Sequence, residues 1–64
     1  MDSTRGAIIA QYSLGQAFEL EGNIDCARDN YKLAELIVER HNQDGIYDYE
    51  LGRIYYGLSN CRAH

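Results

Sequence analysis

Apolar residues in the middle of the chain recur at steps of three and four, which is the period of an α-helix. This stripe comprises Ile24, Ala27, Tyr31, Ala34, Val38 and His41, and Leu33 and Ile37 widen it. Charged residues of both signs occupy the other side. The pattern predicts a helix over about residues 24–42, with the apolar stripe on a core and the charged side in water.

The same spacing predicts one helix before this segment and one after it. Over about 4–21 the spacing links Ala7, Ala10, Leu14, Ala17, Phe18 and Glu21, with Asp2 or Ser3 as the expected cap. Over about 46–60 the apolar side comprises Leu51, Ile54, Tyr55 and Leu58. Gly57 weakens the last turn of this helix, so we expect its end to fray near Asn60.

Two polar clusters separate the three segments. Gly22 suits the left-handed position that ends a helix, and Asn23 suits the cap of the next one. Residues 42–45 read Asn-Gln-Asp-Gly, which is a typical turn composition. No strand-like alternation occurs, so we expect a single all-α domain over 1–64, with three antiparallel helices.

A chain of 64 residues buries only about 60% of the surface that its unfolded form exposes, so it needs additional stabilisation. Cys26 and Cys61 are too few for a disulfide framework, and neither has metal-ligand spacing to His41 or His64. We therefore expect no metal and no cofactor. The two cysteines suit small core residues, although a disulfide between them is conceivable. Self-association, as a homodimer, is the remaining source of stability.

The charge and the apolar runs restrict the partners. Ten acidic and six basic side chains give a net charge of −4, which makes nucleic acid an unfavourable partner. The apolar run Ala7–Ala10 is too short for a signal sequence or a membrane span. With two cysteines that have no evident pairing, these features favour a cytoplasmic protein without a membrane partner.

A short motif occurs twice. Residues 12–18 and 49–55 both read Tyr-x-Leu-Gly-x-apolar-aromatic, and their starts at 12 and 49 are 37 residues apart. An internal period of this size is typical of helical-repeat proteins, which usually hold another polypeptide.

The residues around the first copy resemble the tetratricopeptide (TPR) repeat. The family's spacing is met by Leu14, Gly15, Phe18, Gly22, Ala27, Tyr31 and Ala34. The resemblance covers residues 8–40 well and 46–57 in part. It implies a helical hairpin in which Gly15 allows a close helix crossing, as Gly52 does in the second copy, and Phe18 and Tyr31 fill the space between the helices.

The sequence also departs from the TPR pattern. Gln11 and Glu39 replace the usual tryptophan and proline, and the period of 37 exceeds the usual 34 or so. A generic three-helix bundle is the alternative. One and a half units are fewer than the three or so that a solenoid needs. We therefore expect a second copy to cover apolar faces of the terminal helices, or a larger protein to do so.

Residues suited to catalysis are hard to find. Glu19 and Glu21 diverge because they are two apart on a helix, and the same holds for Asp48 and Glu50. His41 has no nucleophile in an evident relation to it, and suits the end of the apolar stripe or a helix C-terminus. We expect no enzymatic activity.

The excess of tyrosine points to an interaction surface. The chain has six tyrosines and one phenylalanine, and a single helix cannot bury all those between residues 47 and 56. Exposed Tyr and Arg are favoured in interfaces, although the phenols could also only border the core. Two matching stripes, turned away from Leu14 and Phe18, are the candidate binding residues: Tyr12, Gln16 and Glu19 in the first copy, and Tyr49, Arg53 and Tyr56 in the second.

The TPR resemblance implies that these two stripes line a groove for a polypeptide segment. The expected function is a small protein–protein interaction module that acts as an adaptor, a chaperone-like cover or an antagonist. The alternative is a transcription-linked regulator with a helix-turn-helix around Gly22–Asn23. The acid Asp25 at the start of the following helix opposes that reading, because it would repel phosphate.

Overall fold

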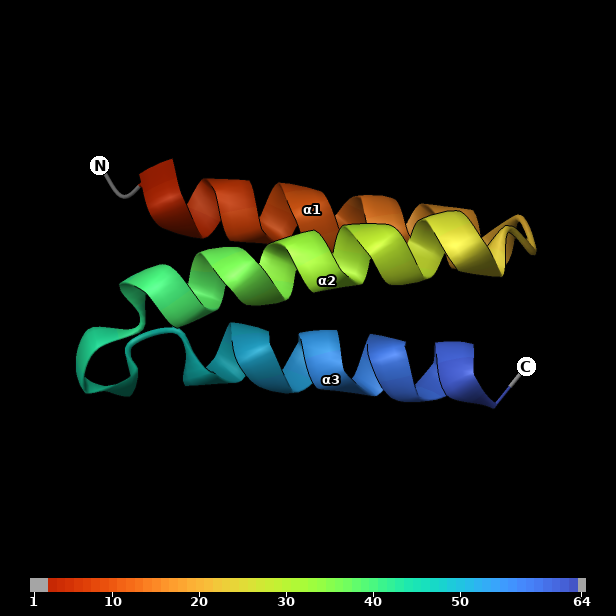
Figure 1. Cartoon of the computed structure of the whole chain (residues 1–64). Helices are drawn as coiled ribbons and strands as arrows, with labels where there is room; N and C mark the ends of the chain where they lie inside the picture. The colour runs from red at the N-terminus through yellow and green to blue at the C-terminus, as the bar shows by residue number, and fades with distance from the viewer. Residues whose placement is uncertain (1–2, 64) are drawn as a thin grey trace.

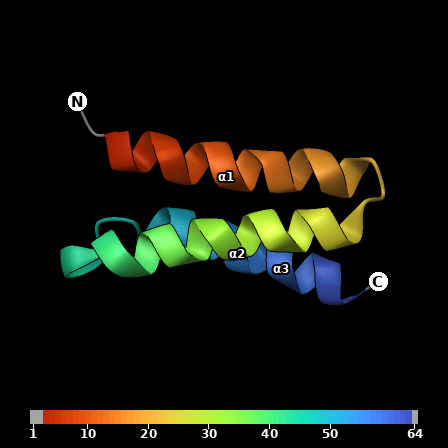
Figure 2. The ribbon, with the colours of Figure 1, turned by 45° about the horizontal axis from the view of Figure 1, so that its top comes forward.

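Three helices lie side by side in the computed structural model, which describes residues 3–63. They are α1 (Ser3–Leu20), α2 (Ile24–His41) and α3 (Asp48–Arg62), and a 3-10 turn (Gln43–Gly45) precedes α3. Successive helices run in opposite directions, and α2 packs beside both α1 and α3 (Figures 1 and 2). No strand occurs within residues 3–63, so the expected all-α class with three antiparallel helices is confirmed.

The helix ends differ slightly from the expected ones. Ser3 is already helical, and Asp2 lies outside the described residues. At the other end, α3 begins at Asp48 instead of 46 and continues past Asn60 to Arg62. The expected fraying does not occur, because Gly57 is buried against another helix.

The connection between α1 and α2 is formed by Gly22 and Asn23 in the way the sequence predicts. Gly22 is left-handed (φ 83°), the Asn23 N–H donates to the Phe18 carbonyl at 2.9 Å, and the Gly22 N–H donates to the Glu19 carbonyl at 3.0 Å. This pair of bonds is the Schellman motif. Asn23 then caps α2, because its Oδ1 accepts from the Cys26 N–H at 3.4 Å.

Asn42 organises the second turn. Its Oδ1 accepts from the Tyr47 N–H at 2.7 Å, and its Nδ2 donates to Asp48 Oδ1 at 2.8 Å. Asp44 and Gly45 are both left-handed, with φ of 57° and 72°. The turn cluster read from the sequence is therefore confirmed, and its compact shape delays the start of α3.

The core forms around the apolar stripe of α2. Ala27, Tyr31, Ala34 and Val38 are buried as expected, although His41 is exposed. They pack with the remaining buried apolar residues, which are Ile8, Tyr47, Ile54 and Cys61. The stripe that was clearest in the sequence is thus the centre of the fold.

The ring of Tyr31 lies between two glycines on different helices. A Cβ added at Gly15 of α1 would lie 2.8 Å from the ring, and one added at Gly57 of α3 would also collide with it. The close approach at Gly15 is therefore real, but its partner is an aromatic side chain and not the helix backbone. Tyr31 joins all three helices at this point.

The buried face of α1 differs from the expected one. Ala7, Ala10, Leu14 and Ala17 are exposed, whereas Ile8 and Gly15 are buried. Phe18 is partly buried against the core, as expected. The exposed set is mostly alanine, and it gains less from burial than the larger Ile8.

Two residues of α3 were also placed wrongly. Tyr55 was expected on the core side, but half of its surface is exposed. Gly52 was expected at a close crossing like that of Gly15, yet a Cβ there would meet nothing within 4 Å. Ile54, Leu51 and Leu58 do pack in or against the core.

A charged side chain inside the fold ties α1 to α3. Glu50 is buried, and its Oε1 accepts from Arg5 Nη1 at 2.9 Å. Arg5 Nη2 also donates to the Ile46 carbonyl at 3.3 Å, and the guanidinium lies 5.2 Å from the centre of the Tyr47 ring. Arg5 therefore holds the start of α1 against the start of α3.

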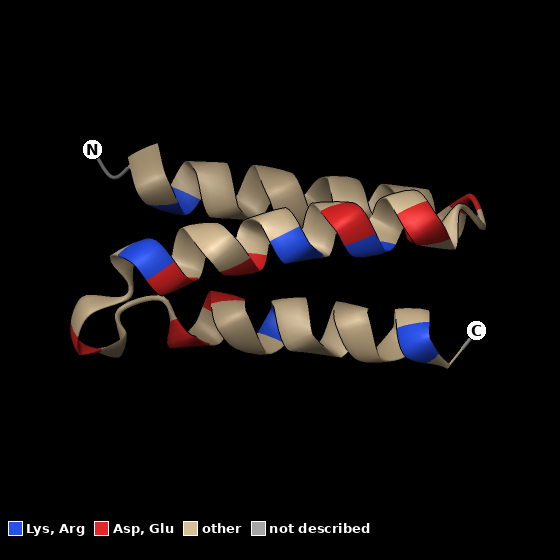
Figure 3. Ribbon diagram, in the orientation of Figure 1, with Lys and Arg blue, Asp and Glu red and all other residues tan. Residues whose placement is uncertain are grey.

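Charge is distributed unevenly over the helices. Figure 3 shows both acidic and basic residues along α2 and few charged residues on α1.

Within residues 3–63, no helix has the length and apolar character needed to cross a membrane.

Candidate functional site

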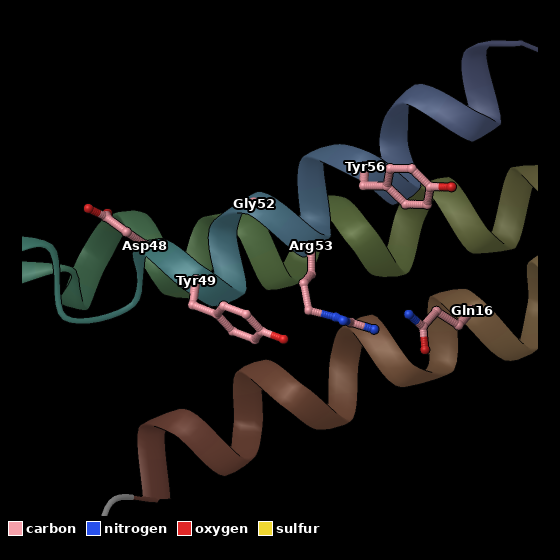
Figure 4. A pocket seen from close by; sticks show the side chains of 6 residues that line it. All are labelled: Gln16, Asp48, Tyr49, Gly52, Arg53 and Tyr56. Atoms are coloured by element: carbon pink, nitrogen blue, oxygen red, sulfur yellow. The ribbon is translucent and has the colours of Figure 1, made fainter.

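A groove with a volume of about 480 Å³ lies along the flank of α3 that faces α1. It is lined by Gln16 from α1 and by Asp48, Tyr49, Gly52, Arg53 and Tyr56 from α3 (Figure 4). Four of the six residues expected to bind a partner are in this list: Gln16, Tyr49, Arg53 and Tyr56. The fold thus brings parts of the two sequence stripes to one place.

Helical spacing positions the three large side chains of the groove. Tyr49, Arg53 and Tyr56 follow one another at steps of four and three on α3, so they share one flank. Ile54 and Gly57 occupy the adjacent side and are buried in the core. Both tyrosines remain 72% exposed. This agrees with the argument that α3 must leave some tyrosines at the surface.

Arg53 connects the two walls of the groove. Its side chain extends from α3 towards α1 in Figure 4, and its guanidinium carbon lies 5.8 Å from the centre of the Tyr12 ring. A cation over an aromatic face at this distance is attracted to it, by about 0.5–1 kcal/mol at exposed sites. The contact orients the guanidinium beside the groove.

Tyr12 was expected to point away from the packing surface, but the structure places it against that surface. It is partly buried and packs against the core cluster. Its ring contacts Arg53 from α1.

A second, smaller groove continues from the first one. It has a volume of about 250 Å³, shares Gln16, Arg53 and Tyr56 with the first groove, and adds Glu19, Leu20, Tyr31, Gly57 and Asn60. Five of the six candidate residues therefore line one continuous depression between α1 and α3, and the sixth, Tyr12, contacts Arg53.

Glu19 has a structural partner in this second groove. The Tyr31 hydroxyl donates to Glu19 Oε1 at 2.8 Å. Burial and then this hydrogen bond raise the pKa of the Tyr31 phenol well above its ordinary value. The phenol therefore stays protonated as a donor, and one oxygen of Glu19 is engaged before any partner arrives.

Six groove residues were not among the candidates read from the sequence, namely Leu20, Tyr31, Asp48, Gly52, Gly57 and Asn60. Asp48 lies at one end, where it is held by Asn42 and points away from Arg53 (Figure 4). Gly52 opens the groove because it has no side chain. Asn60 was predictable, because it lies four residues after Tyr56 and extends the same stripe.

The described residues offer few groups for covalent or metal chemistry. Within residues 3–63, no cluster of three or more His, Cys, Asp or Glu side chains could hold a metal ion. Both cysteines are free thiols. Burial, and then the negative charge of Glu19, raise the pKa of the Cys61 thiol, while Arg28 lowers it. What the groove offers is two exposed aromatic rings, one oriented cation, the amide of Gln16 and the carboxylate of Asp48 at one end.

Comparisons with known proteins give no relative from which a function could be transferred: no family profile, curated protein or solved structure matches the chain.

Proposed function

We propose that this protein is a small interaction module that binds a polypeptide segment in the groove between α1 and α3. The observation that carries the proposal is the arrangement of Tyr49 and Tyr56, both 72% exposed, on either side of Arg53. Tyrosine and arginine are, with tryptophan, the residues enriched at the energetic centres of protein interfaces. Aromatic rings held at a surface groove gain favourable free energy when a partner covers them.

The shape and charge of the groove define the kind of segment. Apolar or aromatic side chains of the partner would cover the rings of Tyr49 and Tyr56. A carboxylate of the partner would pair with Arg53, which has a guanidinium at the surface and is supported by Tyr12. Asp48 at the edge and Glu19 in the adjoining groove oppose a strongly acidic segment. The best fit is an apolar segment with one acidic residue.

The binding would act sterically, by covering part of a larger protein, as in an adaptor or an antagonist. We extend the proposal to a cytoplasmic homodimer, since a core of this size is marginal on its own and both thiols are free. The TPR resemblance supports the proposed groove only in the α1–α2 hairpin, where Gly15 packs closely on Tyr31. The open position at Gly52 gives no support for a second repeat.

The helix-turn-helix alternative gains no support from the geometry. In that motif the two helices cross at about 90–120°, whereas α1 and α2 run antiparallel along their length (Figures 1 and 2). The net charge of −4 also opposes phosphate binding.

The proposal is tested by selecting binders from a random peptide library displayed on phage. We expect the selected peptides to combine apolar residues with an acidic one, and to shift the amide signals of residues 49–56 in NMR spectra. Arg53→Glu should weaken their binding by about tenfold or more, because it replaces an attractive pair by a repulsive one.

Arg62→Glu is the matched control. It makes the same charge change on the same helix, but Arg62 lies on the other flank of α3, in a groove shared with α2. Peptide binding should survive this change, and both variants should keep their helical circular dichroism. If Arg53→Glu binds the selected peptides as well as the original chain does, the groove is not the site.

A further inference from the structure

The outer face of α2, defined here as Asp29, Leu33, Leu36 and Arg40, is turned away from the core. Leu33 is 49% exposed and Leu36 is 54% exposed. Leu33 was expected to widen the buried stripe, but the helical period places it with Leu36 on the side opposite Tyr31 and Val38. A groove of about 340 Å³ beside these leucines is also lined by Gln11 and Ile37.

The outer face of α2 has an order of charges that complements itself when reversed. Asp29 precedes Leu33 by four residues, and Arg40 follows Leu36 by four residues. Reversing the helix about the midpoint between residues 34 and 35 exchanges 33 with 36 and 29 with 40. An antiparallel copy would therefore place leucine opposite leucine and acid opposite base.

A second charge pair comes close to the same relation, because the reversal takes position 32 to the level of position 37, two residues from Glu39. Lys32 and Glu39 are exposed on one flank of the outer face, and the reversal brings Lys32 of one chain to the level of Glu39 of the other, within about one helical turn. None of Asp29, Lys32, Glu39 and Arg40 forms an ion pair or a side-chain hydrogen bond with another described residue. Their charges are therefore available to a partner.

We propose that a second copy of this chain packs antiparallel on the outer face of α2, related by a two-fold axis at the level of Ala34 and Glu35. The two-fold axis makes every contact occur twice. The two charges of the outer face, Asp29 and Arg40, and the two on its flank, Lys32 and Glu39, sum to zero, so two chains of net charge −4 can meet here without local repulsion. A partner of one charge sign would not be matched in this way.

The proposal deepens the homodimer of the proposed function and locates it away from the peptide groove. The peptide groove lies between α1 and α3, whereas the outer face of α2 borders Gln11 of α1 and shares no lining residue with that groove. Each copy in such a dimer would keep its own groove open. The sequence favoured the terminal helices for this contact, whereas the self-complementary charges favour the middle one.

Sedimentation equilibrium of the full chain tests the interface. We expect the unmodified chain to dimerise, and Leu36→Glu to weaken the association by at least about tenfold, because the change buries two charges against the leucines. Leu20→Glu is the control: Leu20 is 91% exposed at the end of α1, outside this surface, and its substitution should leave the dimer intact. A chain that stays monomeric up to its solubility limit, or a dimer insensitive to Leu36→Glu, would overturn the proposal.

A charge-reversal cycle tests the antiparallel register itself. Arg40→Asp and Asp29→Arg should each weaken the dimer by about tenfold, because each places like charges together twice. The double variant should recover most of the association. Arg40 also complements the helix dipole in the last turn of α2, so circular dichroism must show whether α2 itself is weakened. If the helices stay intact and the double variant associates no better than the single ones, this pairing is wrong.

The groove and the dimer can fail separately. Leu36→Glu should lose the dimer and keep peptide binding, whereas Arg53→Glu should lose peptide binding and keep the dimer. If Leu36→Glu loses both, the outer face of α2 is not independent of the groove, and the proposed arrangement is incorrect.

Discussion

The two copies of the Tyr-x-Leu-Gly motif have opposite roles in the fold. In α1 the residues that face the core are those at motif positions one, four and seven: Tyr12, Gly15 and Phe18. In α3 they are those at positions two, three and six: Glu50, Leu51 and Ile54. The same letters therefore lie on two different sides of their helices relative to the core.

This difference teaches that a shared motif fixes neither the buried face nor the purpose of a glycine. Gly15 leaves room for the Tyr31 ring, whereas Gly52 faces open space. Tyr12 is half-buried beneath Arg53, whereas Tyr49 is exposed in the groove. What decides is the neighbouring helix: α1 packs mainly on α2, and α3 has Ile54 and Gly57 to bury.

The largest contrast is expected between the two glycines of the motif. Gly15→Leu should destabilise the fold by about 3 kcal/mol, because the ring of Tyr31 cannot move away freely. That is most of the stability of a domain this small. Gly52→Leu should leave the melting temperature within a few degrees of the original value. Thermal unfolding followed by circular dichroism measures both. Equal effects at the two positions would contradict the contrast.

The second positions of the two copies form the next comparison. Glu50 is buried and paired with Arg5, while Ser13 is exposed. Arg5→Ala should cost about 1–3 kcal/mol, because it leaves a buried carboxylate without its donor. Ser13→Ala should change stability by less than about 0.5 kcal/mol.

Urea unfolding measures these two changes. Combining Arg5→Ala with Glu50→Gln should recover part of the loss, since no buried charge then remains. No recovery would show that Arg5 acts mainly through its other contacts, with Ile46 and Tyr47.

Of the two motif glycines, only Gly15 lies against Tyr31. The environment of Tyr31 predicts that the free energy of unfolding depends on pH. The folded state raises the pKa of the Tyr31 phenol, so the unfolded chain releases this proton at lower pH than the folded chain. The contribution of the protonated Tyr31 phenol to the free energy of unfolding is complete below the ordinary tyrosine pKa of about 10. It is lost as the pH rises above that value, at up to about 1.4 kcal/mol per pH unit.

Urea unfolding at a series of pH values up to 11 or so tests this prediction. Tyr31→Phe should remove the slope above pH 10 or so. The raised pKa of Cys61 adds a similar loss that begins one to two pH units lower, so Cys61→Ala is needed as a matched background. An unchanged slope in Tyr31→Phe would exclude Tyr31 as its source.

The smallest effect should be a gain. Gly52→Ala should stabilise α3 by about 0.5–1 kcal/mol, because glycine is costly inside a helix and nothing lies within 4 Å of the added methyl group. Gly15→Ala should give no such gain. A loss of stability at position 52 would mean that the position is packed in a way that the groove does not reveal.

The sequence allowed the architecture and much of the groove to be predicted. The stripe of α2 was predicted correctly because the larger residues, Tyr31 and Val38, and the alanines, Ala27 and Ala34, recur with the same helical spacing. The stripe of α1 was misread because Ala7, Ala10 and Ala17 carry little apolar weight, and a set rotated by one residue, starting at Ile8, fits the same period.

Contacts between distant residues were beyond the reach of pattern reading. A glutamate such as Glu50 reads as a surface residue until Arg5, 45 residues away, is placed beside it. Gly57 reads as a weak point in a helix until Tyr31 is packed onto it. The groove residues of α3 were found because their spacing alone determines a shared flank, whereas the burial of Tyr12 depends on where α1 turns its side.

The position of Tyr31 between Gly15 and Gly57 has a consequence for how this sequence can drift. Neither glycine can gain a side chain while an aromatic ring occupies position 31, and a smaller residue at 31 would leave two gaps at once. The three positions, on three different helices, should therefore change together or not at all. In related chains, a small aliphatic residue at the position of Tyr31 should be accompanied by alanine or larger residues at both glycine positions.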